Sequence, residues 1–296
     1  MTQTSMREQF AATTVELLDA DPSVALVLAD ISERFFRDAM RHHPERVINV
    51  GIREQLAVNV GAGIALTGMR PIVHTFASFL IERSFEQIKL GFAHQGVGGV
   101  LVSAGASYDN SESGRTHQSP ADVALIDTLP DWEIHVPGHP AELDALLRQA
   151  VAGPGPVYIR TSDRSNRSPQ PTGGLQVLDR GGQGTVVVVG PLLDNVLAAV
   201  PDLDVTVLYA STVRPFDADT LVATLDRADV VLVEPYAVGT SAAAVSAALA
   251  DVPHRLKAIG VPKVELRRYG TSAEHETAYS LDPAGLRRTI TDFLGH

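Results

Sequence analysis

Residues 51–68 read Gly51-Ile-Arg-Glu-Gln-Leu-Ala-Val-Asn-Val-Gly-Ala-Gly-Ile-Ala-Leu-Thr-Gly68. The stretch opens with a carboxylate, Glu54, and continues in residues that are almost all small or aliphatic. Such a run predicts a helix buried on nearly all sides, in which Gly61 and Gly63 let a neighbouring backbone approach closely. A carboxylate at the head of a buried helix is costly to desolvate unless something binds it. The alternative is that Glu54 only complements the helix dipole.

Short apolar runs alternate with helical patterns along the rest of the chain. Val24–Ala29 and Thr185–Val189 are continuous and short, as is typical of strands buried on both faces of a parallel sheet. This alternation predicts an α/β protein with two parallel-sheet domains. We expect the first domain at 1–165 and the second at 185–296. Residues 166–184, which lack sustained periodicity, are predicted to form the linker.

The composition narrows the functional classes. The chain has 296 residues, of which 45% are hydrophobic and 20% charged, which describes a soluble globular protein. A formal net charge of −11 argues against nucleic acid or an anionic membrane as a partner. The absence of Cys excludes disulfides, thiolate nucleophiles and Cys-ligated metals, and it is compatible with a cytoplasmic location. Neither a signal-peptide pattern nor an apolar run of spanning length is present.

Two further motifs follow the Glu54 stretch. They are Thr75-Phe-Ala-Ser-Phe-Leu-Ile-Glu-Arg-Ser-Phe-Glu-Gln-Ile88 and Gly114-Arg-Thr-His-Gln118. Together with the Glu54 stretch they resemble the "G-I-x-E-Q", "T-F-x-x-F … R-x-[FY]-[DE]-Q-I" and "G-P-T-H-Q" motifs of transketolase-type enzymes. The resemblance covers nearly the whole chain. It implies a thiamine diphosphate pyrimidine-binding domain followed by a transketolase C-terminal-like domain.

The resemblance assigns cofactor contacts to four residues. Glu54 is expected to share a proton with N1′ of the aminopyrimidine, so that the 4′-amino group can take the thiazolium C2 proton. Phe79 is expected to stack on the aminopyrimidine and Phe76 to line its pocket, although Phe is most often plain core. Asp30 matches a family Asp near the cofactor, and it can equally be a cap at the end of a strand.

The resemblance also implies substrate contacts. His117 is expected to donate to a substrate hydroxyl or to a developing oxyanion, with Gln118 beside it. Where the family has "E-D-G-P-T-H-Q", the sugar-binding Asp is Ser113 here and the Pro is Arg115. We expect Gln118, Ser113 and Arg115 to bind substrate.

Two other departures concern the family's phosphate and sugar contacts. The family's substrate His is Gly105, and the Arg that grips the sugar phosphate is Asp163. Replacing a bidentate cation by a carboxylate weakens phosphate binding. Arg7, Arg115 or Arg164 could compensate, and Arg7 is our further candidate for substrate binding. We therefore expect a changed donor or acceptor, one that can lack a phosphate.

The motif "G-D-G … N", which holds Mg²⁺ and the cofactor's diphosphate in this family, is absent. The resemblance thus implies a subunit of a split transketolase. Its partner, an N-terminal subunit, would supply the Mg²⁺ and diphosphate site in an α2β2 assembly. Alternatives are the E1 β-type subunit of a 2-oxoacid dehydrogenase and a deoxyxylulose-phosphate-synthase-like enzyme. From another class, a non-catalytic partner subunit that retains the fold also fits.

Overall fold

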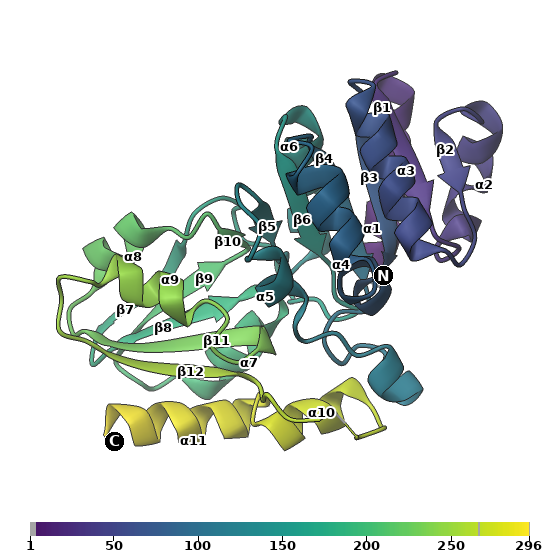
Figure 1. Cartoon of the computed structure of the whole chain (residues 1–296). Coiled ribbons are helices and arrows are strands. Elements are labelled where there is room, and N and C mark those ends of the chain that lie inside the picture. The colour runs from purple at the N-terminus through teal and green to yellow at the C-terminus, as the bar shows by residue number, and fades with distance from the viewer. Residues whose placement is uncertain (1–3, 266, 296) are drawn as a thin grey trace.

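The larger of two sheets has seven strands in the order β10-β5-β6-β4-β3-β1-β2 (Figure 1). The computed structural model describes residues 4–265 and 267–295. All strand pairs of this sheet are parallel except β10–β5. The strands are β1 (Val24–Leu28), β2 (Val47–Asn49), β3 (Arg70–Phe76), β4 (Gly99–Ala104), β5 (Glu133–His135), β6 (Pro156–Arg160) and β10 (Thr212–Arg214).

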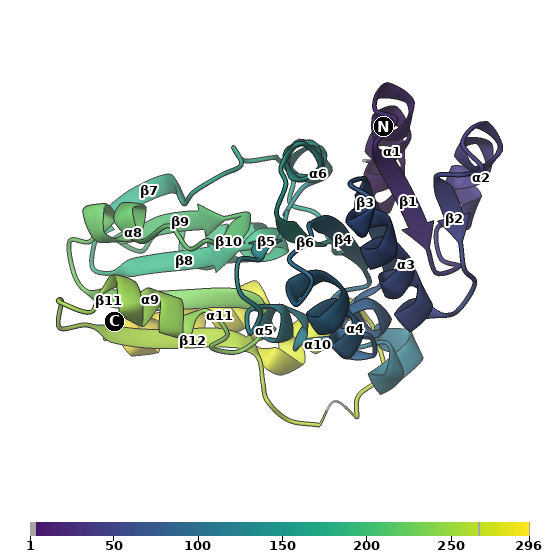
Figure 2. The same ribbon diagram turned by 45° about the horizontal axis from the view of Figure 1, so that its top comes forward.

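Helices cover both faces of this sheet. Side chains of α1 and α6 pack with β1 and β4 in one cluster, while those of α3, α4 and η2 pack on the opposite face. Figure 2 shows α1 and α6 on one side of the strands and α3 on the other. The helical segments are α1 (Met6–Ala20), α2 (Glu33–His42), α3 (Glu54–Leu66), η1 (Ser78–Glu82), α4 (Phe85–Ile88), η2 (Lys89–Ala93), η3 (Ser111–Thr116), α5 (Asp122–Ile126) and α6 (Pro140–Ala152).

The second sheet has five strands in the order β12-β11-β8-β9-β7, parallel except at β7–β9. Helices α7 and α11 pack on one face, and α8 and α9 pack on the other. Its strands are β7 (Gln176–Gly182), β8 (Thr185–Val189), β9 (Val205–Ala210), β11 (Asp229–Ala237) and β12 (Arg255–Val261). Its helices are η4 (Gly190–Leu192), α7 (Leu193–Ala199), α8 (Ala218–Thr224), α9 (Ala242–Ala248), α10 (Ser272–Tyr279) and α11 (Pro283–Leu294).

The predicted fold class is confirmed, with two differences in detail. Residues 176–182, expected within the linker, form the antiparallel edge strand β7. The short strand β10 comes from the second half of the chain but pairs with β5 in the first sheet. Both strands lie at sheet edges, where side chains are only partly buried, so neither shows a continuous apolar run. The domain boundaries at 165 and 185 stay a prediction.

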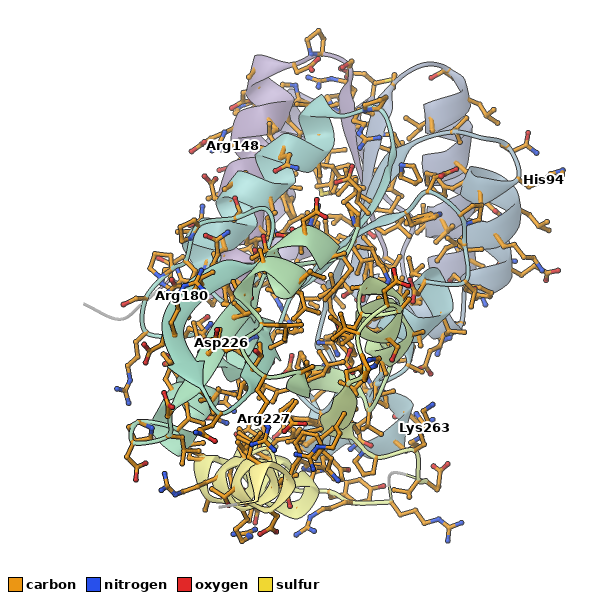
Figure 3. All side chains as sticks on the ribbon, turned by 90° about the vertical axis from the view of Figure 1, so that its left-hand side faces the viewer. His94, Arg148, Arg180, Asp226, Arg227 and Lys263 are labelled. Atoms are coloured by element: carbon orange, nitrogen blue, oxygen red, sulfur yellow. The ribbon has the colours of Figure 1, made fainter. Side chains whose placement is uncertain are left out.

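The outside of the molecule carries many charged side chains, of which Arg148, Arg227 and Lys263 are examples (Figure 3). Across residues 4–265 and 267–295, every helix is too short or too polar to cross a bilayer.

Helix α3 packs against β3 through a small-residue face. A Cβ added at Gly61 would lie 2.4 Å from Cγ2 of Val73, with Cζ of Phe92 also in contact. Gly63 is exposed, and a Cβ there would meet nothing within 4 Å. The two glycines therefore differ in function: Gly61 allows the helix to approach the sheet, whereas Gly63 does not.

We predict that Gly61→Ala lowers the free energy of unfolding by about 1–2 kcal/mol, because overpacking outweighs the gain in helix propensity. The control Gly63→Ala should leave stability unchanged or raise it by up to about 1 kcal/mol. Urea unfolding of the two variants checks this. Equal effects of both substitutions would contradict the packing assigned to Gly61.

Candidate active site

The turn between β2 and α3 delivers Glu54 to the carboxyl edge of the first sheet. Asn49 organises this turn, because its Oδ1 accepts hydrogen bonds from the backbone N–H groups of Asp30 (3.1 Å) and Gly51 (2.9 Å). Its Nδ2 donates to Glu33 Oε2 at 2.9 Å. Gly51 has a φ of 71°, which favours glycine. Asn49 lies outside the sequence motifs described above, although Asn at the end of a strand is a common turn former.

Glu54 is the first residue of α3, and only 2% of its surface is exposed. Its Oε2 accepts a hydrogen bond of 2.9 Å from Nη1 of Arg83. The Arg83 guanidinium also lies over the ring of Phe79, 4.0 Å from the centroid. A π-helical backbone bond from Arg83 N to Ser78 O (3.1 Å) sets this arrangement. The buried carboxylate thus has a cationic partner that contacts the neighbouring phenyl ring.

An aromatic cluster surrounds this pair. The rings of Phe76 and Phe79 are 6.2 Å apart, and the imidazole of His117 lies 5.7 Å from Phe76 and 5.1 Å from Phe79. The guanidinium of Arg7, from α1, lies 5.6 Å from the Phe76 centroid. The structure therefore brings together five of the residues singled out in the sequence, from α1, α3, the β3–η1 junction and the loop after β4.

The loop that carries His117 is closed at its base. Ser107 and Ser119 form an antiparallel bridge, and Ser119 Oγ donates to Glu82 Oε1 at 3.1 Å. Burial raises the pKa of the Glu82 carboxyl. His117 itself is half-buried, with its Nδ1 3.0 Å from Oγ1 of Thr116. That contact leaves Nε2 as the ring nitrogen suited to a substrate oxygen.

The other residues expected at the substrate are placed differently. The Gln118 side chain is fully buried, and its Nε2 donates to the carbonyl oxygen of Arg268 at 3.2 Å. Arg115 binds Glu265 Oε1 (3.1 Å) and the carbonyl oxygen of Gln118 (3.1 Å). Ser113 is exposed on η3. Substrate binding by these three residues stays a prediction, and for Gln118 and Arg115 the observed contacts favour a structural part.

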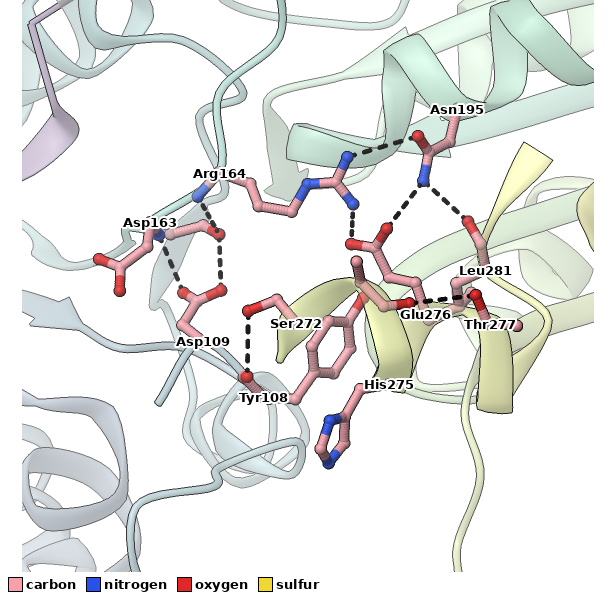
Figure 4. A network of polar contacts seen from close by, with 12 residues as sticks. Tyr108, Asp109, Asp163, Arg164, Asn195, Ser272, His275, Glu276, Thr277 and Leu281 are labelled. Carbon is pink, nitrogen blue, oxygen red and sulfur yellow. Dashed lines mark hydrogen bonds and ion pairs between the residues drawn. The ribbon is translucent and has the colours of Figure 1, made fainter. Parts of the chain in front are cut away.

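Carboxylates collect at the end of β6. Asp109 accepts a hydrogen bond from the backbone N–H of Asp163 at 3.0 Å, and burial together with the Asp163 charge raises its pKa to about 7. The adjacent Arg164 turns toward the second half of the chain, where it pairs with Glu276 and contacts Asn195 (Figure 4). Arg164 is therefore already engaged and does not replace the missing phosphate-binding cation.

Gly105 has a φ of 67°, and the space beside it is filled. A Cβ at this position would lie 2.1 Å from Nδ2 of Asn110 and 3.0 Å from Cδ1 of Phe76. Nδ2 of Asn110 is buried and has no hydrogen-bond partner among the described residues. A side chain as large as His at position 105 does not fit this loop conformation.

Two residues of the same region lie nearer β1. Asp30 is exposed at the end of that strand with a φ of 67°, and its backbone N–H is held by Asn49. Its cofactor role stays a prediction. His74 is buried in β3, with Nε2 2.9 Å from Ser32 Oγ and Nδ1 2.8 Å from the Val102 carbonyl oxygen. Burial lowers the pKa of His74 to about 3.

The described ranges hold no group of three or more His, Cys, Asp or Glu side chains placed to bind a metal ion. The site does suit an aminopyrimidine, because the buried Glu54 carboxylate is joined through Arg83 to the ring of Phe79, and the Phe76 ring lies 6.2 Å from that of Phe79. A protonated ring nitrogen can satisfy such a carboxylate. The residues present therefore fit the pyrimidine half of thiamine diphosphate.

The chain is similar in sequence and fold to known proteins. Residues 2–168 match the family model described as "Transketolase, pyrimidine binding domain". In solved structures, the chain is similar to a "Split gene transketolase, inactive beta4 tetramer", with a TM-score of 0.85, 25% identity and 99% coverage of both chains. It superimposes on transketolase from Campylobacter jejuni with a TM-score of 0.81 at 16% identity, covering 98% of this chain and 47% of the other.

Several proteins are similar to this chain in sequence. A protein of Rhodococcoides fascians, described as an uncharacterized 33.6 kDa protein in the fasciation locus, is 50% identical over 99% of this chain and 96% of its own. The 6-deoxy-6-sulfo-D-fructose transketolase subunit SqwH of a Clostridium strain is 28% identical over 86% and 84%. The 1-deoxy-D-xylulose-5-phosphate synthase of Thermus thermophilus is 31% identical over 84% of this chain. The chain spans about half the length of such synthases, here 42%.

The depressed pKa of His74 predicts a pH-dependent stability. Between pH 6.5 and about 3 the unfolded chain binds a proton at this imidazole that the folded chain excludes, so the stability falls as the pH falls through that window. Relative to a His74→Gln variant, the wild type should lose about 1.4 kcal/mol per pH unit there. Denaturant unfolding of both proteins from pH 7 to 4 measures it. A His94→Gln variant, changed at an exposed imidazole, is the control and should track the wild type. A constant difference between wild type and His74→Gln would contradict the prediction.

Proposed function

The chain belongs to the transketolase family, and from that premise we propose that it is the pyrimidine-binding subunit of a split, thiamine diphosphate-dependent transketolase-like enzyme. The enzyme transfers a two-carbon ketol unit from a ketose donor to an aldehyde acceptor. The observation that carries the proposal is the convergence of the buried Glu54 carboxylate with Phe79 and His117. Each comes from a different motif of the sequence, and together they meet the needs of cofactor binding and substrate binding.

The roles of the cofactor-binding residues follow from their positions. When bound, thiamine diphosphate supplies a thiazolium carbon that becomes a nucleophile toward a ketose carbonyl. Glu54 would share a proton with N1′ of the aminopyrimidine, and its burial would keep water from competing for this proton. Phe79 and Phe76 supply the apolar walls, with Asp30 as a further candidate at the edge. When the pyrimidine binds, Arg83 would either share the Glu54 carboxylate with it or give up its hydrogen bond to Glu54.

His117 is the candidate for the substrate. With Nδ1 near the Thr116 hydroxyl, its Nε2 can donate to the donor's C1 hydroxyl or to an oxygen that gains negative charge. The guanidinium of Arg7 lies 5.6 Å from the Phe76 centroid, and Arg7 is the candidate for a second polar contact.

The partner is an N-terminal transketolase subunit that carries the diphosphate-binding domain and holds most of the Mg²⁺ site. The described residues lack a metal-binding cluster, and the sequence lacks the metal-diphosphate motif. The similar solved structure is described as an inactive tetramer of β chains, and the Clostridium relative is named a subunit. These observations support a partner subunit, and we further propose an α2β2 heterotetramer in which this chain alone is inactive.

The substrate is expected to lack a phosphate group. The family pattern has a phosphate-binding Arg at the position that is Asp163 in this chain. Arg164 pairs with Glu276, and Arg115 pairs with Glu265. Placing a phosphate beside the Asp109 and Asp163 carboxylates would cost electrostatic energy. The Clostridium relative is named for a sulfonated sugar, so the family includes a donor other than a sugar phosphate.

A second candidate, from a different class, is a non-catalytic subunit that keeps the fold. The similar β4 tetramer is inactive by its description, and this favours a non-catalytic subunit. The Glu54 site argues against it, because burying a carboxylate costs free energy and binding of a cofactor would give that burial a use.

Removing the Glu54 carboxylate tests the assignment. In an assembly reconstituted with a chain that carries the metal-diphosphate motif, Glu54→Ala should lower kcat by about 10²–10⁴-fold, the range of a general acid–base group. Turnover of an unphosphorylated ketose with an aldehyde acceptor is the measurement, with Glu45→Ala, at an exposed carboxylate, as the control. Unchanged turnover in the Glu54 variant would favour the non-catalytic subunit.

The phosphate prediction has its own test. The wild-type assembly should turn over free ketoses at least as well as their phosphate esters, compared by kcat/KM. Asp163→Arg should shift that preference toward the esters by about 10- to 100-fold, the value of a charged hydrogen bond. Asp179→Arg adds the same charge on the exposed strand β7 and should not shift it. A strong wild-type preference for phosphorylated ketoses would refute the proposal.

A further inference from the structure

The second half of the chain contacts the loop that carries His117. This part of the fold has no role in the function proposed above. Residues 267–279 nevertheless lie against residues 105–119 at several points. Figure 4 shows Tyr108 of the loop beside His275 and Ser272 of α10.

Gln118 is the centre of this contact. Its side chain is fully buried, and its amide nitrogen lies 3.2 Å from the Arg268 carbonyl oxygen and 3.4 Å from Nε2 of His275. The ring nitrogens of His275 also face carbonyl oxygens, with Nδ1 3.0 Å from that of Thr271 and Nε2 3.2 Å from that of Arg268. The Gln118 amide nitrogen, the Arg268 carbonyl oxygen and His275 Nε2 therefore form one buried polar cluster. The amide therefore joins the loop directly to α10.

His275 is held rigidly on its own side. Its ring is fully buried and stacks on the ring of Tyr108, with centroids 5.9 Å apart and planes 11° apart. Ser272 Oγ lies 3.5 Å from the Tyr108 carbonyl oxygen. The first turn of α10 is closed by a capping box between Thr271 and Glu274. The support for the loop is thus a capped helix end, which is a stiff element.

Two outer contacts complete the support. Arg115 bridges from the Glu265 carboxylate to the Gln118 carbonyl oxygen. Gly114, with a φ of 69°, lies under the ring of Tyr269, and a Cβ there would be 2.6 Å from Cε1 of that ring. The loop and the segment from the second half fit each other closely only with glycine at this position.

His117 follows Thr116 and precedes Gln118, so its placement depends on this support. His117 donates its backbone N–H to the Gly114 carbonyl oxygen at 3.1 Å, and its ring makes edge-on contacts with Phe76 and Phe79 and one contact with Thr116. The backbone bond stays within the loop and the ring contacts are weak, so neither fixes where the loop lies. We propose that the second half of the chain positions the His117 imidazole, with Gln118 and His275 as positioning residues. This inference rests on the proposed function, since it assigns a task within the same site.

The test uses three variants of the full chain. Gln118→Met removes the amide donors and keeps the side-chain length, and His275→Phe keeps the stack on Tyr108 but removes both ring nitrogens. Arg115→Ala loosens the loop from an exposed position, so the fold survives even if the buried variants do not. The control Tyr209→Phe removes a buried hydrogen bond to Glu142 that also joins the two halves but does not contact this loop.

The first readout needs no activity. The Hε1 proton of His117, assigned with a His117→Gln variant, should be shifted by the rings of Phe76 and Phe79 in NMR spectra of the wild type. The three variants should move this signal toward that of a solvent-exposed histidine. Amide hydrogen exchange should also rise at least about tenfold in residues 105–119 while α3 stays protected. The Tyr209→Phe control should do neither.

The second readout is kinetic, on the reconstituted assembly. A displaced imidazole lowers kcat by about 10- to 100-fold with KM changed far less. A raised KM with unchanged kcat for Gln118→Met would show that Gln118 binds substrate and would overturn the inference. An unchanged His117 signal in all three variants would overturn it too. If the wild-type assembly has no transferase activity, the proposed function fails, and the NMR and exchange results still decide whether the loop is held as described.

Discussion

A carboxylate buried at the first residue of a helix is the constraint on which the rest of this structure depends. Glu54 keeps only 2% of its surface exposed, so its charge must be met by a partner. Arg83 provides one through a π-helical turn, and the same turn sets Phe79 beside the pair. Gly61 lets α3 lie close enough to β3 for this burial. Helix packing, backbone irregularity and electrostatics thus converge on a single side chain.

Much of the fold could be predicted from the sequence because its strands are buried on both faces. Runs such as Val24–Ala29 and Thr185–Val189 are continuously apolar, so they can be recognised as buried strands. The helices between them have apolar residues at helical spacing. The edge strands β7 and β10 escaped prediction because they are short or half-exposed. The π-helical turns η1 and η2 could not be foreseen either, since their i→i+5 bonds leave no periodic signature in the sequence.

The candidate site shows the same division. Glu54, Phe79 and His117 lie in motifs, and the structure brings them together. Contacts that depend on the tertiary fold were beyond the sequence: the Asn49 amide that shapes the turn, the Arg83 partner and the burial of Gln118. The substrate side departs most from the family pattern. In this expected substrate region, Arg164 and Arg115 are each paired with a glutamate, so their positive charges are already neutralised.

The antiparallel pairing of β10 with β5 makes the second half of the chain part of the first sheet. A strand from beyond residue 210 completes the edge of a sheet whose other strands all lie before residue 161. A fragment without it would leave β5 with an open row of backbone groups, which is a template for self-association. If the carboxyl half were exchanged between relatives in evolution, the new β10 would have to pair with the old β5. The two halves are therefore expected to be inherited together.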